Sequence, residues 1–141
     1  MPNHTGGCLC AAVRFELMAA PQAVVICHCT HCQKHSGSAF SLNLLMLEGD
    51  VELRGATRVF VDQGDSGLPS YRHFCPNCGS PVFTKAENLP GMVIVKAGAV
   101  DSLEGIRPQM EIYTEHAQQW LAPIPHATRF RQAPSAEQAS R

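Results

Sequence analysis

The chain has 141 residues, and its 11 Lys and Arg nearly balance its 12 Asp and Glu, so the formal net charge is −1. This length fits one domain. The lack of a basic excess argues against nucleic acid and against an anionic membrane surface as partners. Seven cysteines are the unusual feature of the composition. They are too few for a short secreted disulfide scaffold, and their number is odd.

The first ten residues, MPNHTGGCLC, contain neither a basic nor an apolar segment, so the sequence predicts no secretory signal. No apolar run approaches the roughly 20 residues that span a bilayer. We therefore expect a cytoplasmic protein without a membrane anchor, in which the thiols stay reduced.

Short apolar or alternating runs recur along the chain and are flanked by Gly, Pro, Asp or Ser, a pattern typical of strands. The predicted strands are 13–17, 23–27, 40–47, 57–61, 71–74, 92–97 and 111–114. Very short helical turns are predicted at 30–36 and 86–89. The fold class is therefore all-β. The aromatic side chains predicted to lie in the core or its wall are Phe15, Phe40, Phe60, Phe74, Tyr113 and Trp120.

Candidate strands continue almost to the C-terminus, so we predict a single domain over residues 1–130. Residues 131–141, RQAPSAEQASR, are small and polar and are predicted to form a flexible tail. Residues 64–70, GDSGLPS, indicate a surface loop, with an active-site lid as the alternative.

The cysteines fall into three groups whose spacings suit metal binding. Cys8 and Cys10 form a C-x-C pair, and on an extended segment both thiols point to the same face. Cys75 and Cys78 form a C-x-x-C turn followed by Gly79, which can adopt the positive φ that such a turn needs. The third group is Cys27, Cys29 and Cys32.

Two half-sites of two cysteines each can make one closed four-thiolate zinc site. In the pairing that uses both two-cysteine groups, the ligands are Cys8, Cys10, Cys75 and Cys78. The central group then keeps three thiolates and one open position, as reactive zinc sites do. The alternative is a second site closed by His28, His31 or His35, which would make the domain a structural zinc module. His28 is the poorest candidate, since it should face away from the metal of its neighbours.

Zinc held by three thiolates carries a formal charge of −1, so it is a weaker Lewis acid than zinc held by histidines. Such a site remains thiophilic. An exchangeable fourth ligand is therefore more plausibly a substrate thiolate than a hydroxide, which indicates sulfur chemistry.

Several motifs together resemble the glutathione-dependent formaldehyde-activating (GFA) family over roughly residues 6 to 130. The resemblance depends on GCLC at 7–10 with VRFE at 13–16, CHCTHC at 27–32 with Gly37 and Phe40, FCPNCGS at 74–80, and RPQMEIYT at 107–114 with Trp120 and Leu121.

The resemblance implies a β-tent fold, in which small antiparallel sheets are held by zinc, and two zinc ions per chain. The first zinc would be structural and bound by Cys8, Cys10, Cys75 and Cys78. The second would be catalytic and bound by Cys27, Cys29 and Cys32. The implied activity is that of a carbon–sulfur lyase, which joins formaldehyde and glutathione into S-hydroxymethylglutathione. A noncatalytic two-zinc module for protein interaction is the alternative.

A reaction at the second zinc also needs a proton carrier and groups that bind the substrate's carboxylates. The candidate acid/base groups are His31, His35 and His73. Lys34 and Arg72 are the candidates for carboxylate binding. Glu111 could be an acid/base group if it is buried near the central cysteines, and otherwise a strand residue that faces solvent.

Overall fold

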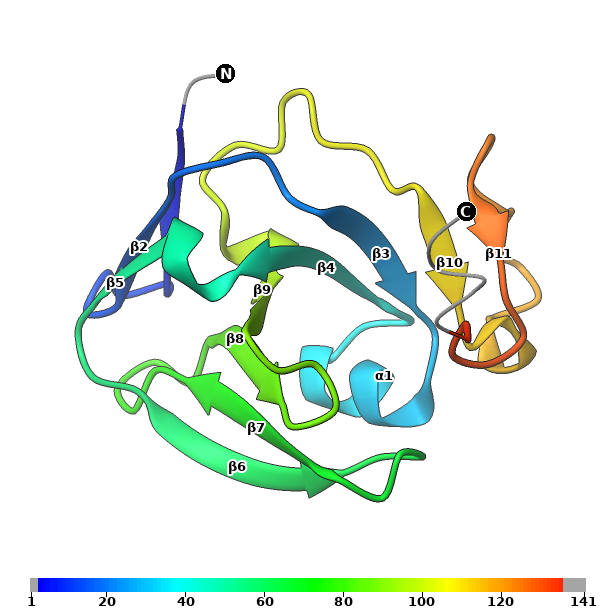
Figure 1. The fold of residues 1–141 in the computed structure, drawn as a ribbon, viewed down its shortest axis with the longest axis horizontal. Helices are drawn as coiled ribbons and strands as arrows, with labels where there is room; N and C mark the ends of the chain where they lie inside the picture. Colours follow the sequence, from blue (N-terminus) through cyan, green and yellow to red (C-terminus); the bar gives the residue numbers. More distant parts are fainter. Residues whose placement is uncertain (1–2, 136–141) are drawn as a thin grey trace.

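The computed structural model describes residues 3–135 and arranges them as two β-sheets with one short α-helix (Figure 1). The first sheet has the order β1 (His4–Gly7), β2 (Arg14–Leu17) and β5 (Val51–Arg54). The second sheet has the order β11 (Thr128–Arg129), β10 (Met110–Ile112), β3 (Ala23–Cys27), β4 (Ser41–Leu47), β9 (Met92–Lys96), β8 (Pro81–Ala86), β7 (Pro69–Phe74) and β6 (Arg58–Gln63).

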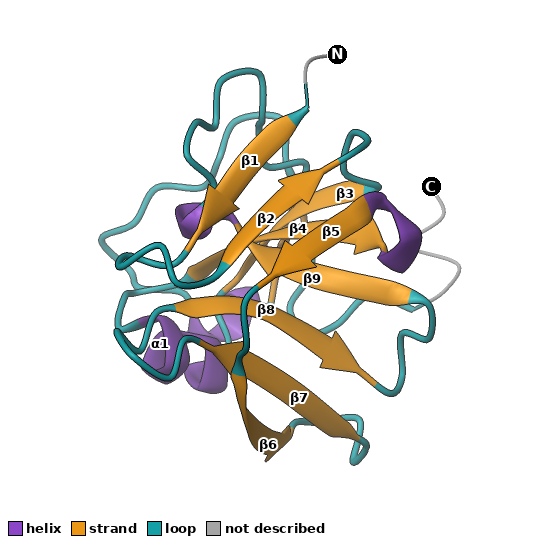
Figure 2. Ribbon diagram, turned by 90° about the vertical axis from the view of Figure 1, so that its left-hand side faces the viewer, coloured by secondary structure: helices purple, strands orange, loops and turns teal. Residues whose placement is uncertain are grey.

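The predicted all-β class is confirmed (Figure 2). Short 3₁₀ turns occupy Glu48–Asp50, Ala97–Ala99 and Thr114–His116. The pairings are antiparallel except that β10 runs parallel to both β3 and β11. No helix within residues 3–135 is long and apolar enough to cross a membrane.

Each of the seven predicted strands overlaps an observed one, and the helix predicted at 30–36 is α1 (Thr30–Ser36). The second predicted helical turn is wrong, because Ala86 ends β8 and residues 87–89 form a hydrogen-bonded turn. Four strands were not predicted. β1 (HTGG) is half glycine and β8 begins with proline, and both residues weaken a strand pattern.

α1 is positioned by its two ends. Cys29 is the N-cap, and its sulfur accepts a hydrogen bond from the backbone N–H of Cys32. Gly37 ends the helix in the left-handed conformation, with φ 65°, where its N–H donates to the carbonyl of Gln33. One turn of helix therefore places Cys29 and Cys32 on the same side, just after β3 delivers Cys27.

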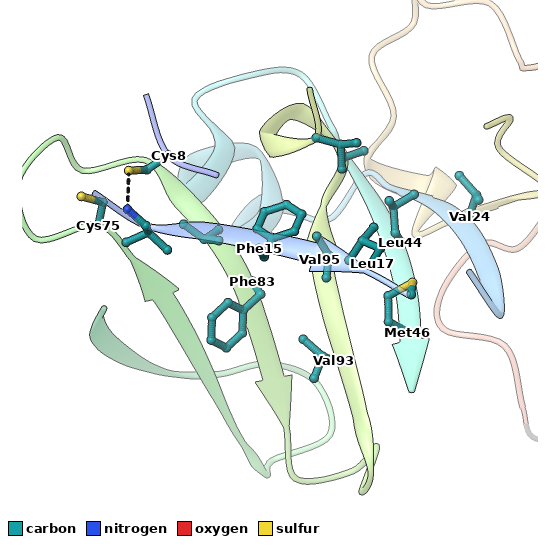
Figure 3. Close-up of a cluster of buried hydrophobic side chains, with 14 residues drawn as sticks. Cys8, Phe15, Leu17, Val24, Leu44, Met46, Cys75, Phe83, Val93 and Val95 are labelled. Carbon is teal, nitrogen blue, oxygen red and sulfur yellow. Dashed lines mark hydrogen bonds between the residues drawn. The ribbon is translucent and has the colours of Figure 1, made fainter. Parts of the chain in front are cut away.

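The core runs from the two-cysteine groups at one end to β3 and β4 at the other (Figure 3). Cys8 and Cys75 lie at one end of it, Phe15 and Phe83 in the middle, and Val24 at the other end. Burial of each large apolar side chain contributes about 1.5–3 kcal/mol. A metal bound by Cys8 and Cys75 would therefore be anchored directly to the core.

Phe15 is buried as predicted, but the core position predicted for two other aromatic residues is wrong. Phe60 is 58% exposed because β6 is the last strand of its sheet, and Trp120 is 74% exposed in a turn. The loop predicted at 64–70 is shorter, since Pro69 already begins β7. Of the predicted tail 131–141, residues 136–141 lie outside the described residues.

Candidate metal centres

Four of the seven cysteines converge from two distant parts of the sequence. The sulfurs of Cys8, Cys10, Cys75 and Cys78 all lie within 4.8 Å of one another. The Sγ–Sγ distances are 3.6 Å from Cys8 to Cys10 and 3.7 Å from Cys10 to Cys75. A tetrahedral zinc with Zn–S bonds of about 2.3 Å needs sulfurs about 3.8 Å apart. This cluster therefore fits a four-thiolate zinc site.

Two turns build the four-cysteine cluster and stabilise negative charge on its sulfurs. The N–H of Val13 donates to the Cys8 sulfur at 3.2 Å, and the N–H of Asn77 donates to the Cys75 sulfur at 3.4 Å. Hydrogen bonds with the side chain and backbone of Ser80 lower the pKa of Cys78 to about 5. Gly79 takes φ 79°, which confirms the conformation expected of it after the second cysteine pair.

The other three cysteines also converge, and they form the three-cysteine cluster: Cys27, Cys29 and Cys32, with all sulfurs within 4.8 Å of one another. Hydrogen bonds from the other two thiols lower the pKa of Cys32 and raise that of Cys27, so the three sulfurs share their protons unequally. A divalent cation that displaces those protons fits the donor set.

No histidine among the described residues joins the three-cysteine cluster. His28 Nε2 donates to Glu111 at 2.8 Å, and His31 Nδ1 donates to Asp62 at 2.8 Å. His35 lies in the wall of a neighbouring cavity. His28 faces away from the sulfurs, as expected. The cluster thus offers a metal three protein ligands, and within residues 3–135 no histidine fills the fourth position.

A cavity of about 340 Å³ lies beside α1, the helix that carries Cys32 and is capped by Cys29. Its walls come from α1, β6 and β7, and its lining residues are Thr30, His31, Lys34, His35, Phe60, Asp62 and Arg72. Arg72 is buried, and its Nε donates to Asp62 at 3.0 Å. Burial, followed by the charges of Arg72 and Lys96, lowers the pKa of His35 to about 4, so its ring is neutral at pH 7.

The structure brings four of the five residues predicted for proton transfer or carboxylate binding to this cavity, namely His31, Lys34, His35 and Arg72. His73 follows Arg72 in β7 and therefore points to the opposite face of the sheet. Its ring makes a 2.8 Å hydrogen bond with Thr57 and stacks on the core residue Phe83 at 4.2 Å.

Glu111 is 1% exposed and is the centre of a buried polar network. Besides accepting from His28, its carboxylate accepts from Arg129 Nη1 at 2.5 Å and from the backbone N–H of Ile124 at 3.1 Å. Because His28 lies between Cys27 and Cys29, the network fixes the backbone that carries two cluster cysteines. Glu111 therefore holds this backbone in place rather than facing solvent.

Lys96 is a buried cation that sequence reasoning missed. It is 8% exposed at the end of β9, and its Nζ donates to Asn43 Oδ1 at 3.0 Å. Its charge helps to lower the pKa of Cys32, while its own pKa is lowered mainly by burial. A lysine after four apolar residues gives no signal of burial. The pairing of β9 with β4 buries it within electrostatic reach of the three thiols.

The fold and the two cysteine clusters define a small all-β protein with two groups of thiols that could hold metal ions. Residues 3–116 match the family model described as "Glutathione-dependent formaldehyde-activating enzyme". The chain belongs to this family, the GFA family.

Three known proteins are similar to this chain in sequence or in structure. A protein of Halomonas elongata, named "Putative glutathione-dependent formaldehyde-activating enzyme", is 32% identical over 102 residues, which cover 69% of this chain and 65% of that protein. An "Uncharacterized lyase" of Schizosaccharomyces pombe is 24% identical over 106 residues, covering 75% of this chain and 74% of the relative. A crystal structure of a Rhodobacter sphaeroides protein shares the fold, with a TM-score of 0.53 at 23% identity over 74% of this chain and 91% of that chain.

Proposed function

We propose that this protein is a zinc-dependent enzyme of the carbon–sulfur lyase type, which forms or cleaves the bond between a thiol and a small aldehyde. Glutathione or a similar thiol would be one substrate, and formaldehyde the simplest aldehyde. The observation that carries the proposal is the three-cysteine cluster, which has no histidine ligand within residues 3–135 and is built partly on α1, the helix that also lines the cavity. The family name and the name of the Halomonas relative support the choice of substrates.

The two clusters take different roles in this proposal. Cys8, Cys10, Cys75 and Cys78 hold a structural zinc, since four thiolates close the coordination sphere and Cys8 and Cys75 belong to the core. Cys27, Cys29 and Cys32 hold the catalytic zinc. When bound there, zinc supplies a position at which a substrate thiol is held as the thiolate.

The reaction moves one proton from sulfur to oxygen. The thiol loses its proton, its sulfur forms a bond with the carbonyl carbon, and the carbonyl oxygen becomes a hydroxyl group. His35 is the proposed proton carrier, because its ring lines the cavity and, with a pKa lowered to about 4, can pass the thiol proton on to the oxygen without retaining it. The reverse sequence releases the aldehyde.

Two cations in the cavity suit a thiol that carries carboxylates. Lys34 is exposed at the rim, where its ammonium group can reach a carboxylate in solvent. Arg72 is buried deeper and is held by Asp62, so its direction is fixed before a ligand arrives. Phe60 adds an apolar surface to the same lining.

Cobalt substitution tests this proposal directly. We expect addition of glutathione, or of a simpler thiol, to change the absorption spectrum of protein loaded with Co²⁺ at both clusters. The variant Cys29→Ser, which keeps only the four-cysteine cluster intact, is the matched control and should show no change on thiol addition. If no thiol perturbs the spectrum and no thiol–aldehyde adduct forms, the enzyme proposal fails and a noncatalytic zinc module is favoured.

A further inference from the structure

β6 (Arg58–Gln63) ends the eight-stranded sheet, so within residues 3–135 only one of its edges is paired, with β7. It lies at the periphery of the molecule in both ribbon views (Figure 1, Figure 2). Five of its six residues are exposed. They include the apolar run Val59, Phe60 and Val61, which are 44%, 58% and 55% exposed. The strand thus presents apolar side chains and unpaired backbone groups together.

An open edge of this kind invites pairing, and natural sheets normally protect it. At the other end of the same sheet the edge strand β11 has only two residues, which offer little length for pairing with a further strand. β6 has six residues, contains no proline, and pairs with β7 in an unbroken register, so no bulge or kink blocks its outer edge. The outer edge of β6 can therefore accept another regular strand.

The sequence of β6, RVFVDQ, is complementary to itself when two copies run antiparallel about Phe60. In that register Arg58 lies opposite Asp62 of the second copy, Val59 lies opposite its Val61, and the two Phe60 residues are neighbours. Opposite charges and apolar pairs in directly opposed positions stabilise antiparallel strands. A shift of one residue would remove both ion pairs and exchange the faces of the strand.

The charges needed for this pairing are available. Arg58 is exposed, and its side chain has no hydrogen bond or ion pair with any other residue in the described range 3–135. Asp62 already accepts from His31 and Arg72, but a carboxylate has about four acceptor positions, which leaves room for another donor. An unpaired cation and a partly used carboxylate four residues apart are what a two-fold interface requires.

We propose that β6 pairs antiparallel with β6 of a second copy of this chain, joining two eight-stranded sheets across a two-fold axis at Phe60. Because Phe60 and Asp62 also line the cavity beside α1, Arg58 and Phe60 of the second copy then lie at its rim. The dimer would complete one wall of the cavity. This inference does not depend on the reaction proposed above.

Sedimentation velocity of the zinc-loaded protein over a range of concentrations tests the dimer. We expect a concentration-dependent dimer for the unaltered chain. Arg58→Glu and Asp62→Arg each place like charges opposite one another twice in the interface, so each variant alone should dissociate at least about tenfold more readily. An equimolar mixture should recover a heterodimer, because the altered charges then oppose each other and the unaltered Arg58 and Asp62 form the second pair.

Two further variants separate this edge from other apolar surface. Val61→Lys puts a charge in the apolar run and should abolish the dimer, whereas Leu47→Lys, at a residue of β4 that is 45% exposed, should leave it unchanged. Circular dichroism verifies that all variants remain folded. A wild-type monomer at near-millimolar concentration overturns the proposal. A dimer that survives both charge variants and Val61→Lys overturns it too, since its interface lies elsewhere.

Discussion

Glu111→Gln removes one negative charge from the buried network and changes almost nothing in shape. The glutamate accepts three hydrogen bonds, from His28, Ile124 and Arg129. Glutamine keeps one acceptor oxygen and replaces the other by an NH₂ group, which would face a donor. The variant therefore weakens the bonds that remain and leaves at least one buried donor unpaired.

The size of the effect follows from the number of bonds. Hydrogen bonds to a charged group contribute about 1 kcal/mol more than neutral ones, and breaking one member of a buried ion pair costs about 3–5 kcal/mol. Because Arg129 is 36% exposed and can turn to water, we take the lower end, about 3 kcal/mol. For a domain of this size that corresponds to a fall in Tm of roughly 10 °C.

Thermal unfolding of the zinc-loaded protein, followed by circular dichroism, measures this difference. Glu115→Gln is the matched control, because Glu115 lies on the same segment but its carboxylate makes one exposed hydrogen bond, from Gln132 Nε2 at 3.3 Å, and two long ion pairs, at 3.6 Å with His116 and 3.8 Å with Arg131. Exposed pairs of this kind contribute little, so its Tm should change by no more than about 2 °C.

The pH dependence gives a second, independent readout. Burial raises the pKa of Glu111, but the hydrogen bonds from His28, Ile124 and Arg129 outweigh burial, and the net direction is downward. A carboxyl with a lowered pKa stabilises the fold above its unfolded pKa and loses that contribution as pH falls. The difference in Tm between wild type and Glu111→Gln should therefore become smaller below about pH 4.5. The role assigned to the network would be refuted if the Tm difference caused by Glu111→Gln were no larger than that caused by Glu115→Gln, or if it increased at acidic pH.

Two further predictions concern the metal centres. Cys78→Ser should lower solubility or Tm strongly, whereas Cys29→Ser should keep the fold and lose only the second metal. Metal titration and circular dichroism measure these effects. If both variants unfold equally, both sites are structural. Lys96→Met should keep the fold but weaken zinc binding at the three-cysteine cluster by about tenfold in a chelator competition. The control variant Lys85→Met removes an exposed lysine paired with Glu48 and should leave zinc binding unchanged. Equal affinities would show that the buried charge does not act on the cluster.

The cysteine spacings predicted the groups well because each half-site is local. A C-x-C on an extended segment, a C-x-x-C turn and an N-capped helical turn each fix two sulfurs within a few residues. The pairing of Cys8 with Cys75 joins residues far apart in the chain, and the prediction succeeded there because only one pairing used both two-cysteine groups. The strands were found for the same reason, since their alternation is a local signal.

The polar surroundings could not be predicted, because strand pairing alone decides which residues face the cysteines. Glu111 and Lys96 occupy ordinary strand positions, and they are buried because β10 joins β3 and β9 joins β4. The predicted core position of Phe60 was wrong because strand pairing leaves it exposed. Its apolar run resembles a core strand, and only the order of strands in the sheet shows that β6 is an edge.

The near-zero net charge of the chain obscured a local excess of positive charge. Three thiolates around Zn²⁺ carry a formal charge of −1, and a substrate thiolate would make it −2. The two buried cations nearby, Lys96 and Arg72, come from different strands, and only Arg72 is paired with a carboxylate, that of Asp62. Lys96 therefore offsets the charge that the cysteines and zinc would create, and in the proposed reaction Lys34 and Arg72 would be the cations that meet a substrate carboxylate.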